Sequence, residues 1–90
     1  MISAFSSDGR IAAYDLVILR DELAIMPPYD ALVLAGRRLT ERHPDVLAAL
    51  SLLDHTVDTE QMRRMNLAVD IERRAPAEVA RELAARLRPP

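Results

Sequence analysis

The sequence has no cysteine and no lysine, only two glycines, and three aromatic residues among its 90 positions. Without cysteine, disulfide bonds and thiolate chemistry are excluded. Two isolated glycines, Gly9 and Gly36, cannot form the glycine-rich loop that cradles phosphate groups. No apolar run approaches the ~20 residues that a membrane-spanning helix needs. The sequence therefore predicts one small domain at most, with no disulfide staple and no phosphate loop.

The charge balance is slightly acidic, with a net charge of −2 and a pI near 5.6. All twelve basic residues are arginine, and acidic residues are interspersed among them, as on solvated helix faces. A nucleic-acid-binding protein would usually show a basic face instead. The stretch from Met1 to Asp8 has neither the basic nor the apolar region of a signal peptide. If the protein is exported, we expect its signal to lie upstream of Met1.

Residues that could carry catalysis are scattered along the chain. His43 precedes a proline and His55 lies beside Asp54, and neither stands at ligand spacing from the other. Ser6 and Ser7 have no base near them in the sequence, so a nucleophile has little support. We predict no catalytic residues, no metal site and no cofactor, and hence a protein that is not an enzyme.

The apolar pattern predicts an α+β fold of two short strands followed by three or four helices. After a turn at 6–9, the segment from Ile11 carries the apolar run Leu16–Leu19, and Ala31–Ala35 is a second run closed by Gly36. Short, β-branched apolar runs favour buried strands. Between the two runs, Pro27 and Pro28 prevent a continuous helix and remove backbone donors for strand pairing.

Helical periodicity begins at Arg37. We predict a short helix over 37–42, a second from Pro44, a third opened by a capping box of Asp58 and Gln61, and a fourth from Pro76. The apolar residues expected on the inner faces of the last three are Val46, Leu47, Leu50 and Leu53, then Met62, Met65 and Val69, then Val79, Leu83 and Leu87.

Two strands are too few for an independently stable sheet, which suggests that their partners belong to sequence outside the chain. Unpaired strand edges invite pairing with another chain. We therefore expect the isolated chain to self-associate through a domain-swapped or strand-paired dimer.

Two of the three aromatic residues, Phe5 and Tyr29, lie beside turn-forming sequence and outside the helical faces. Aromatic faces bind a trimethylammonium cation, which has no hydrogen-bond donor, with about 0.5–2 kcal/mol per ring. Such a site needs several rings from separate segments, and this chain could supply two. On spacing alone, a place in the core is the simpler interpretation of both rings.

Two segments carry recognisable motifs: Ala4–Ile11 reads Ala-Phe-Ser-Ser-Asp-Gly-Arg-Ile, and Met26–Ala31 reads Met-Pro-Pro-Tyr-Asp-Ala. They resemble the stretches Ala-Tyr-Ser-Thr-Asp-Gly-Arg-Ile and Phe-Pro-Pro-Tyr-Asp-Ala of one known family, the OpuAC-like glycine betaine/carnitine/choline binding proteins of ABC transporters. Tyr14–Asp21, Thr40–Asp45 and Pro76–Glu82 also resemble family segments. The resemblance covers nearly the whole chain but only the last third of the family's length.

The resemblance implies the C-terminal part of a type II periplasmic-binding-protein fold, a clamp of two lobes. Residues 1–28 would end the second lobe, and residues 29–90 would complete the first, with Tyr29 at the return crossing. Tyrosines of the family form an aromatic cage, and two of them fall at Phe5 and Tyr29. Phenylalanine at position 5 keeps the ring face and lacks the hydroxyl.

The function implied is part of the substrate-binding component of an ABC importer for quaternary-ammonium osmoprotectants. Its partners would be an osmolyte and the transporter permease, without nucleic acid, in the periplasm or at the outer face of the cell membrane. The preferred osmolyte is left open, as is whether the full protein is a lipoprotein, soluble or fused to the permease. The alternative is a free-standing small helical protein-interaction domain without a small-molecule ligand.

Overall fold

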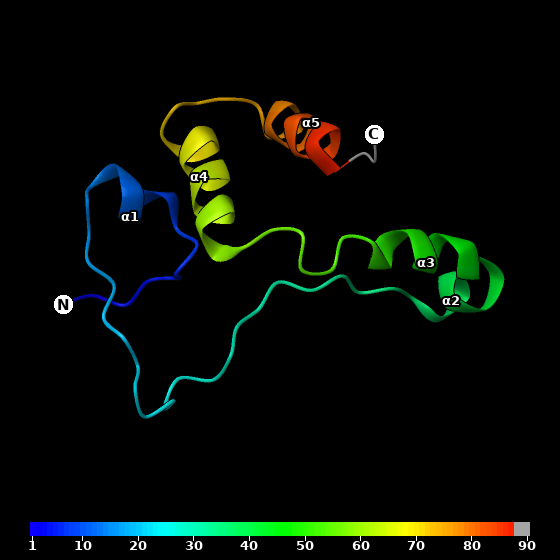
Figure 1. Cartoon of the computed structure of the whole chain (residues 1–90), viewed down its shortest axis with the longest axis horizontal. Helices are drawn as coiled ribbons and strands as arrows, with labels where there is room; N and C mark the ends of the chain where they lie inside the picture. The colour runs from blue at the N-terminus through cyan, green and yellow to red at the C-terminus, as the bar shows by residue number, and fades with distance from the viewer. Residues whose placement is uncertain (88–90) are drawn as a thin grey trace. The chain divides into compact units, whose positions relative to one another are not determined.

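The structure, a computed structural model, describes residues 1–87. The helices in this part of the chain are α1 (Gly9–Ala13), α2 (Arg37–Arg42), α3 (Pro44–Ser51), α4 (Thr59–Asp70) and α5 (Pro76–Leu87) (Figure 1). They belong to two compact units: the first joins Met1–Ile18 to the segment that begins at Val57, and the second is Leu19–Thr56. None of these helices has the length and apolar character needed to cross a membrane.

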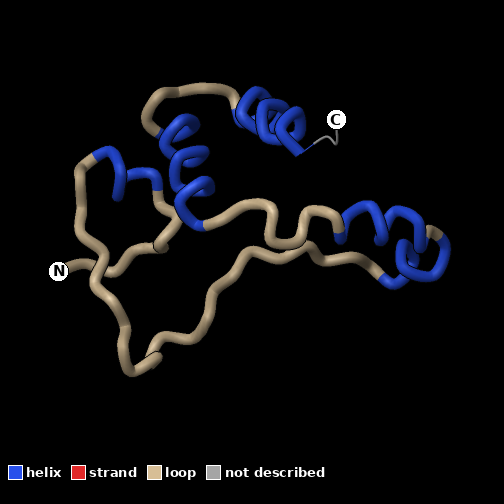
Figure 2. The backbone as a smooth tube through the Cα atoms, in the orientation of Figure 1, coloured by secondary structure: helices blue, strands red, loops and turns tan. Residues whose placement is uncertain are grey.

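The predicted α+β fold class is wrong for this chain. Residues 1–87 contain no β-strand, and the backbone between α1 and α2 is loop throughout (Figure 2). The expected runs Leu16–Leu19 and Ala31–Ala35 lie within that loop, and Ile11 lies in α1 instead of a strand. A strand is stabilised by a hydrogen-bonded neighbour and by burial of one face. These runs have neither, since Val17 is 86% exposed and Leu34 is 88% exposed.

The four helices predicted from Arg37 onward are confirmed. At the start of α4, the Gln61 backbone N–H donates to Asp58 Oδ1 at 2.7 Å, and the Asp58 backbone N–H donates to Gln61 Oε1 at 2.9 Å. This is the capping box expected from the sequence, and it satisfies two backbone donors at the N-terminus of the helix. Pro44 and Pro76 are the first residues of α3 and α5, where a missing N–H costs no hydrogen bond.

The core of the first unit is small. Its buried apolar side chains are Ile11 of α1, Ala68 of α4 and Val79 of α5. The face predicted from Met62, Met65 and Val69 is half-buried, and Ala68 is the α4 residue that packs most deeply. A small core is expected for a chain of this length, because little of its surface can be buried.

The loop between α4 and α5 is tied to α5 by an arginine. Arg74 Nη2 donates to Glu78 Oε1 at 2.7 Å and also pairs with Glu82. Hydrogen bonding to Arg74 holds the pKa of Glu82 below its usual value. Because Glu78 and Glu82 are exposed and Arg74 is only half-buried, the pairs orient the start of α5 more than they stabilise the unit.

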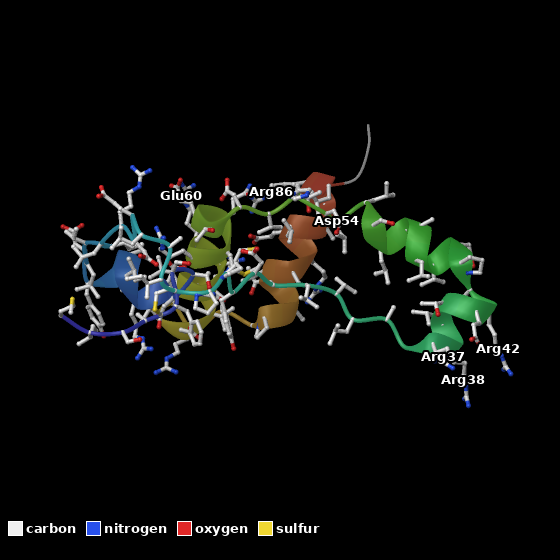
Figure 3. All side chains as sticks on the ribbon, turned by 90° about the horizontal axis from the view of Figure 1, so that it is seen from below. Arg37, Arg38, Arg42, Asp54, Glu60 and Arg86 are labelled. Carbon is white, nitrogen blue, oxygen red and sulfur yellow. The ribbon has the colours of Figure 1, made fainter. Side chains whose placement is uncertain are left out.

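In the second unit, α2 and α3 pack against each other across a break at His43. Gly36 stands at the N-cap of α2 without a side-chain cap, and the His43 N–H closes the helix on the Leu39 carbonyl. Figure 3 shows Arg37, Arg38 and Arg42 extending away from α3. Their position agrees with the solvated helix face expected from the sequence.

Candidate functional site

Phe5 begins a tight turn that leads into α1. The Asp8 N–H donates to the Phe5 carbonyl at 3.0 Å, which closes a four-residue turn over Ser6 and Ser7. Asp8 then acts as the N-cap of α1, since its Oδ1 accepts from the Arg10 N–H at 2.9 Å. The turn predicted from the Ser-Ser-Asp-Gly sequence is therefore present, and it presents Phe5 at its first position.

Asp8 also forms a two-pronged ion pair with Arg10. Arg10 Nε donates to Oδ1 at 3.0 Å, and Arg10 Nη2 donates to Oδ2 at 2.7 Å. The side-chain hydrogen bonds from Arg10, reinforced by its backbone N–H, lower the pKa of Asp8 from 3.8 to about 2. Asp8 is consequently ionised near neutral pH, and a charged carboxylate is the stronger acceptor for the cap.

The turn is fastened to α4 by two side chains. Arg63 Nε donates to the Ser6 carbonyl at 2.9 Å, across 57 residues of sequence. Asn66 Nδ2 donates to the Ser7 carbonyl at 2.8 Å, across 59 residues. The start of α1 lies directly against α4, as Figure 1 also shows. The Phe5 turn, α1 and α4 thus form one packed assembly.

Gly9 is where this assembly is tightest. A Cβ placed on Gly9 would lie 2.4 Å from the Leu67 backbone nitrogen and 2.7 Å from the Leu67 Cα. Backbone atoms inside a helix cannot move aside for a side chain. The close approach of α1 to α4 therefore requires glycine at this position.

Tyr29 lies in the second unit, in the loop that precedes α2. Upstream of it, Asp21 Oδ2 accepts from the Met26 N–H at 2.8 Å, which bends the chain just before Pro27 and Pro28. That backbone hydrogen bond is the main reason that the pKa of Asp21 is lowered. The backbone leading to Tyr29 is thus shaped by a local turn and two prolines, and not by hydrogen bonds to a neighbouring strand.

The two candidate rings are both open to solvent in this chain. Phe5 is 62% exposed and Tyr29 is 82% exposed. The interpretation of both rings as core residues is therefore wrong within residues 1–87. Phe5 belongs to the first unit and Tyr29 to the second, and their joint role in one cage stays a prediction.

The roles of Arg63 and Asn66 were not predicted from the sequence. The general pattern of interspersed charges predicts a solvated helix face, and it holds for Arg64, which pairs with Glu60, labelled on α4 in Figure 3. The signal available was the i, i+3 spacing of Arg63 and Asn66, which places both donors on one helix face. Nothing in the sequence identified the carbonyls that they meet. Among residues 1–87, no group of three or more histidine, aspartate or glutamate residues stands where it could hold a metal ion.

The family model described as the substrate-binding domain of ABC-type glycine betaine transport systems, OpuAC, matches residues 1–86. The chain belongs to this family, which is a class of binding proteins and not of enzymes. The resemblance inferred from the motifs is thereby confirmed.

Curated relatives carry related names. The chain is 36% identical over 78 residues to the carnitine transport binding protein OpuCC of Listeria monocytogenes, covering 87% of this chain and 25% of that protein. It is 29% identical over 75 residues to the glycine-betaine-binding protein of Pseudomonas aeruginosa, covering 83% and 24%. It is 28% identical over 86 residues to the ergothioneine transport permease/ergothioneine binding protein EgtU of Helicobacter pylori, covering 96% and 16%.

The chain therefore spans a quarter or less of the length of these relatives. No solved structure was found to match it.

Proposed function

We propose that the chain forms part of the substrate-binding component of an ABC importer for quaternary-ammonium osmolytes, with glycine betaine, carnitine and choline as candidates. The observation that carries this proposal is the family match over residues 1–86. The names of the carnitine-binding and glycine-betaine-binding relatives support the ligand class. A free-standing interaction domain has no comparable support.

In this proposal, Phe5 and Tyr29 are two walls of an aromatic cage for the trimethylammonium group. A quaternary ammonium ion cannot donate a hydrogen bond, so ring faces are the groups that hold it. The solvent exposure of both rings in this chain fits residues that close on a ligand. Tyr29 supplies a hydroxyl as well as a face, whereas Phe5 supplies the face alone.

Transport would follow from a clamp mechanism. Ligand contacts made only in the closed state stabilise closure of the two lobes, and the closed protein then engages the permease. We propose that residues 1–28 end one lobe and residues 29–90 complete the other. Hydrogen exchange at 26–30, the proposed crossing, should then change when ligand binds. The protein would work in the periplasm or at the outer face of the cell membrane.

The test is titration calorimetry on the natural protein that carries this chain. Glycine betaine, carnitine, choline and ergothioneine form the ligand panel. Replacing either cage ring, Phe5→Ala or Tyr29→Ala, should weaken binding roughly 2- to 30-fold, the equivalent of 0.5–2 kcal/mol per ring. Tyr14→Ala is the matched control, because Tyr14 is 65% exposed and has no assigned place in the cage.

Failure of the wild-type protein to bind any member of the panel would overturn the proposed function. Binding that is unchanged in both ring variants would leave the transporter assignment in place and remove the cage from it.

A further inference from the structure

Three successive peptide groups of the Phe5 turn are held by hydrogen bonds. The Phe5 carbonyl accepts from the Asp8 N–H, the Ser6 carbonyl accepts from Arg63, and the Ser7 carbonyl accepts from Asn66. Each peptide group is planar, so a hydrogen bond to its carbonyl restrains the whole plane. With the planes on the C-terminal side of Phe5 restrained, the direction in which its Cα–Cβ bond leaves the backbone is restricted.

The support under this turn is firm. Arg63 and Asn66 are half-buried, and they stand on a helix whose first turn is closed by a capping box. Beside them, Gly9 lies in backbone contact with α4, and Ile11 is buried. The Phe5 side chain is exposed while the backbone that carries it is anchored. This combination suits a residue that must present a ring in one direction before a ligand arrives, because preorganisation lowers the cost of binding.

Among the arginine bonds of residues 1–87, the bond of Arg63 stands apart by the distance along the chain that it spans: Arg81 also donates through Nε to a backbone carbonyl, but to that of nearby Ala77. Arg64, the neighbour of Arg63, pairs with a carboxylate one helical turn away, as Arg10 and Arg74 pair with carboxylates of their own. Arg63 instead donates through Nε to a backbone carbonyl of a distant segment. Asn66, three residues further on, does the same through Nδ2. Two donors on one helix face thus serve two consecutive carbonyls of the turn.

We propose that Arg63 and Asn66 are positioning residues for the Phe5 ring, so that α4 sets the direction of one wall of the ligand site without touching the ligand. The proposal rests on the proposed function, since it needs Phe5 to contact the quaternary ammonium group. It assigns a binding role to a helix that contributes no aromatic residue of its own.

The variants remove one donor each with little change in shape. Asn66→Asp replaces the amide donor by an acceptor of the same size, and Arg63→Met keeps the aliphatic stem but loses the guanidinium. Arg64→Met is the matched control, because Arg64 lies next to Arg63 on α4 and pairs with Glu60 instead of the turn. All are made in the natural protein, with and without Phe5→Ala.

Titration calorimetry with glycine betaine, carnitine and choline provides the first readout. We expect Asn66→Asp and Arg63→Met to weaken binding at least about threefold when Phe5 is present and to have no further effect in Phe5→Ala, because the coupling passes through the ring. Arg64→Met should bind as the wild type does. Equal losses in both backgrounds would show that the two residues act on overall structure and would overturn the positioning role.

Hydrogen exchange of ligand-free protein provides the second readout, which does not depend on binding. Amides of residues 5–8 should exchange faster in Asn66→Asp and Arg63→Met than in the wild type. Their exchange should be unchanged in Arg64→Met. Unchanged exchange in the first two variants would overturn the fastening itself. If the two variants exchange faster but the wild-type protein binds no member of the panel, the fastening stands and the proposed function is overturned, and with it the role of the ring.

Discussion

At the scale of single residues, Gly9 decides whether α1 can lie on α4. Its missing side chain leaves room for the backbone of Leu67, which a Cβ would approach to 2.4 Å. Gly9 does not have a positive φ, since the positive-φ positions among the described residues are Asp15, Ala24, His55 and Arg73. Space, and not backbone freedom, is what this position needs.

We therefore expect Gly9→Ala to destabilise the protein by about 1–3 kcal/mol, the usual cost of forcing atoms into a packed contact. Urea unfolding measures the loss. Gly36→Ala is the control: nothing lies within 4 Å of the added Cβ, so no clash arises, and alanine in place of an N-cap glycine should cost at most about 1 kcal/mol. Equal stability of the two variants would contradict the close packing of α1 on α4.

The cap of α1 carries a pH dependence at the same scale. The pKa of Asp8 is lowered from 3.8 to about 2 by its bonds to Arg10. A lowered folded-state pKa means that the stabilisation is present above pH 3.8 and is lost as the pH falls toward 2.

We expect wild-type Tm to fall more than the Tm of Asp8→Asn between pH 5 and pH 2, because asparagine still caps a helix and does not titrate. Thermal unfolding monitored by circular dichroism across this range makes the comparison. Parallel curves for the two proteins would contradict the ion pair. The difference between the two Tm curves excludes the contributions of other carboxylates whose pKa is lowered, such as Asp21 and Glu82, because both proteins contain them.

At the scale of elements, α4 has a clear start signal in the sequence, and it also supports the Phe5 turn. Its capping box satisfies backbone donors at its first turn. Asp58→Ala should cost about 1 kcal/mol of unfolding free energy, the typical value of an N-cap side chain. Thr59→Ala, at the next and exposed position, should change stability by less than about 0.5 kcal/mol. Chemical denaturation of both variants tests the difference, and equal effects would contradict the cap.

Elements with local signals were predicted correctly, and elements that need distant partners were not. Pro44, Pro76 and the Asp58–Gln61 pair each specify a helix start within a few residues. The run Leu16–Leu19 has the composition of a strand, but a strand needs a neighbouring chain segment to bond to. Helix α1 was missed because five residues, Gly9–Ala13, are too few to show a period.

At the scale of the whole molecule, exposed apolar side chains concentrate between α1 and α2. They include Leu19 at 70%, Leu23 at 81% and Leu34 at 88% exposure. Monomeric proteins rarely expose large apolar surfaces without a partner for them. A strand-paired dimer is no longer expected, because residues 1–87 contain no strand whose edge could pair. Self-association stays a prediction, which now rests on the exposed apolar side chains alone.

We expect the isolated 90-residue chain to sediment as larger species as its concentration rises. The double variant Leu19→Glu and Leu34→Glu should shift it toward monomer, because like charges repel across an apolar contact. Glu22→Gln, which lies in the same segment, is the control. A wild-type chain that stays monomeric at high concentration would contradict the prediction.

The isolated chain should also bind osmolytes weakly or not at all. It spans 25% of the carnitine-binding relative and offers at most two proposed cage rings. Titration of the chain with glycine betaine and choline measures this. Micromolar affinity would mean that a sufficient site lies within these residues.

The sequence by itself determined the family, four of the helices and the two rings proposed for the ligand. These depend on motifs and spacings within short stretches, such as Met26–Ala31 and the capping box at Asp58. The tertiary structure decided that the strand-like runs are loop, that Gly9 meets the backbone of α4, and that Arg63 and Asn66 hold the turn of Phe5. The physical reason is separation along the chain: those hydrogen bonds join residues 57 and 59 positions apart, where no local pattern records the partner.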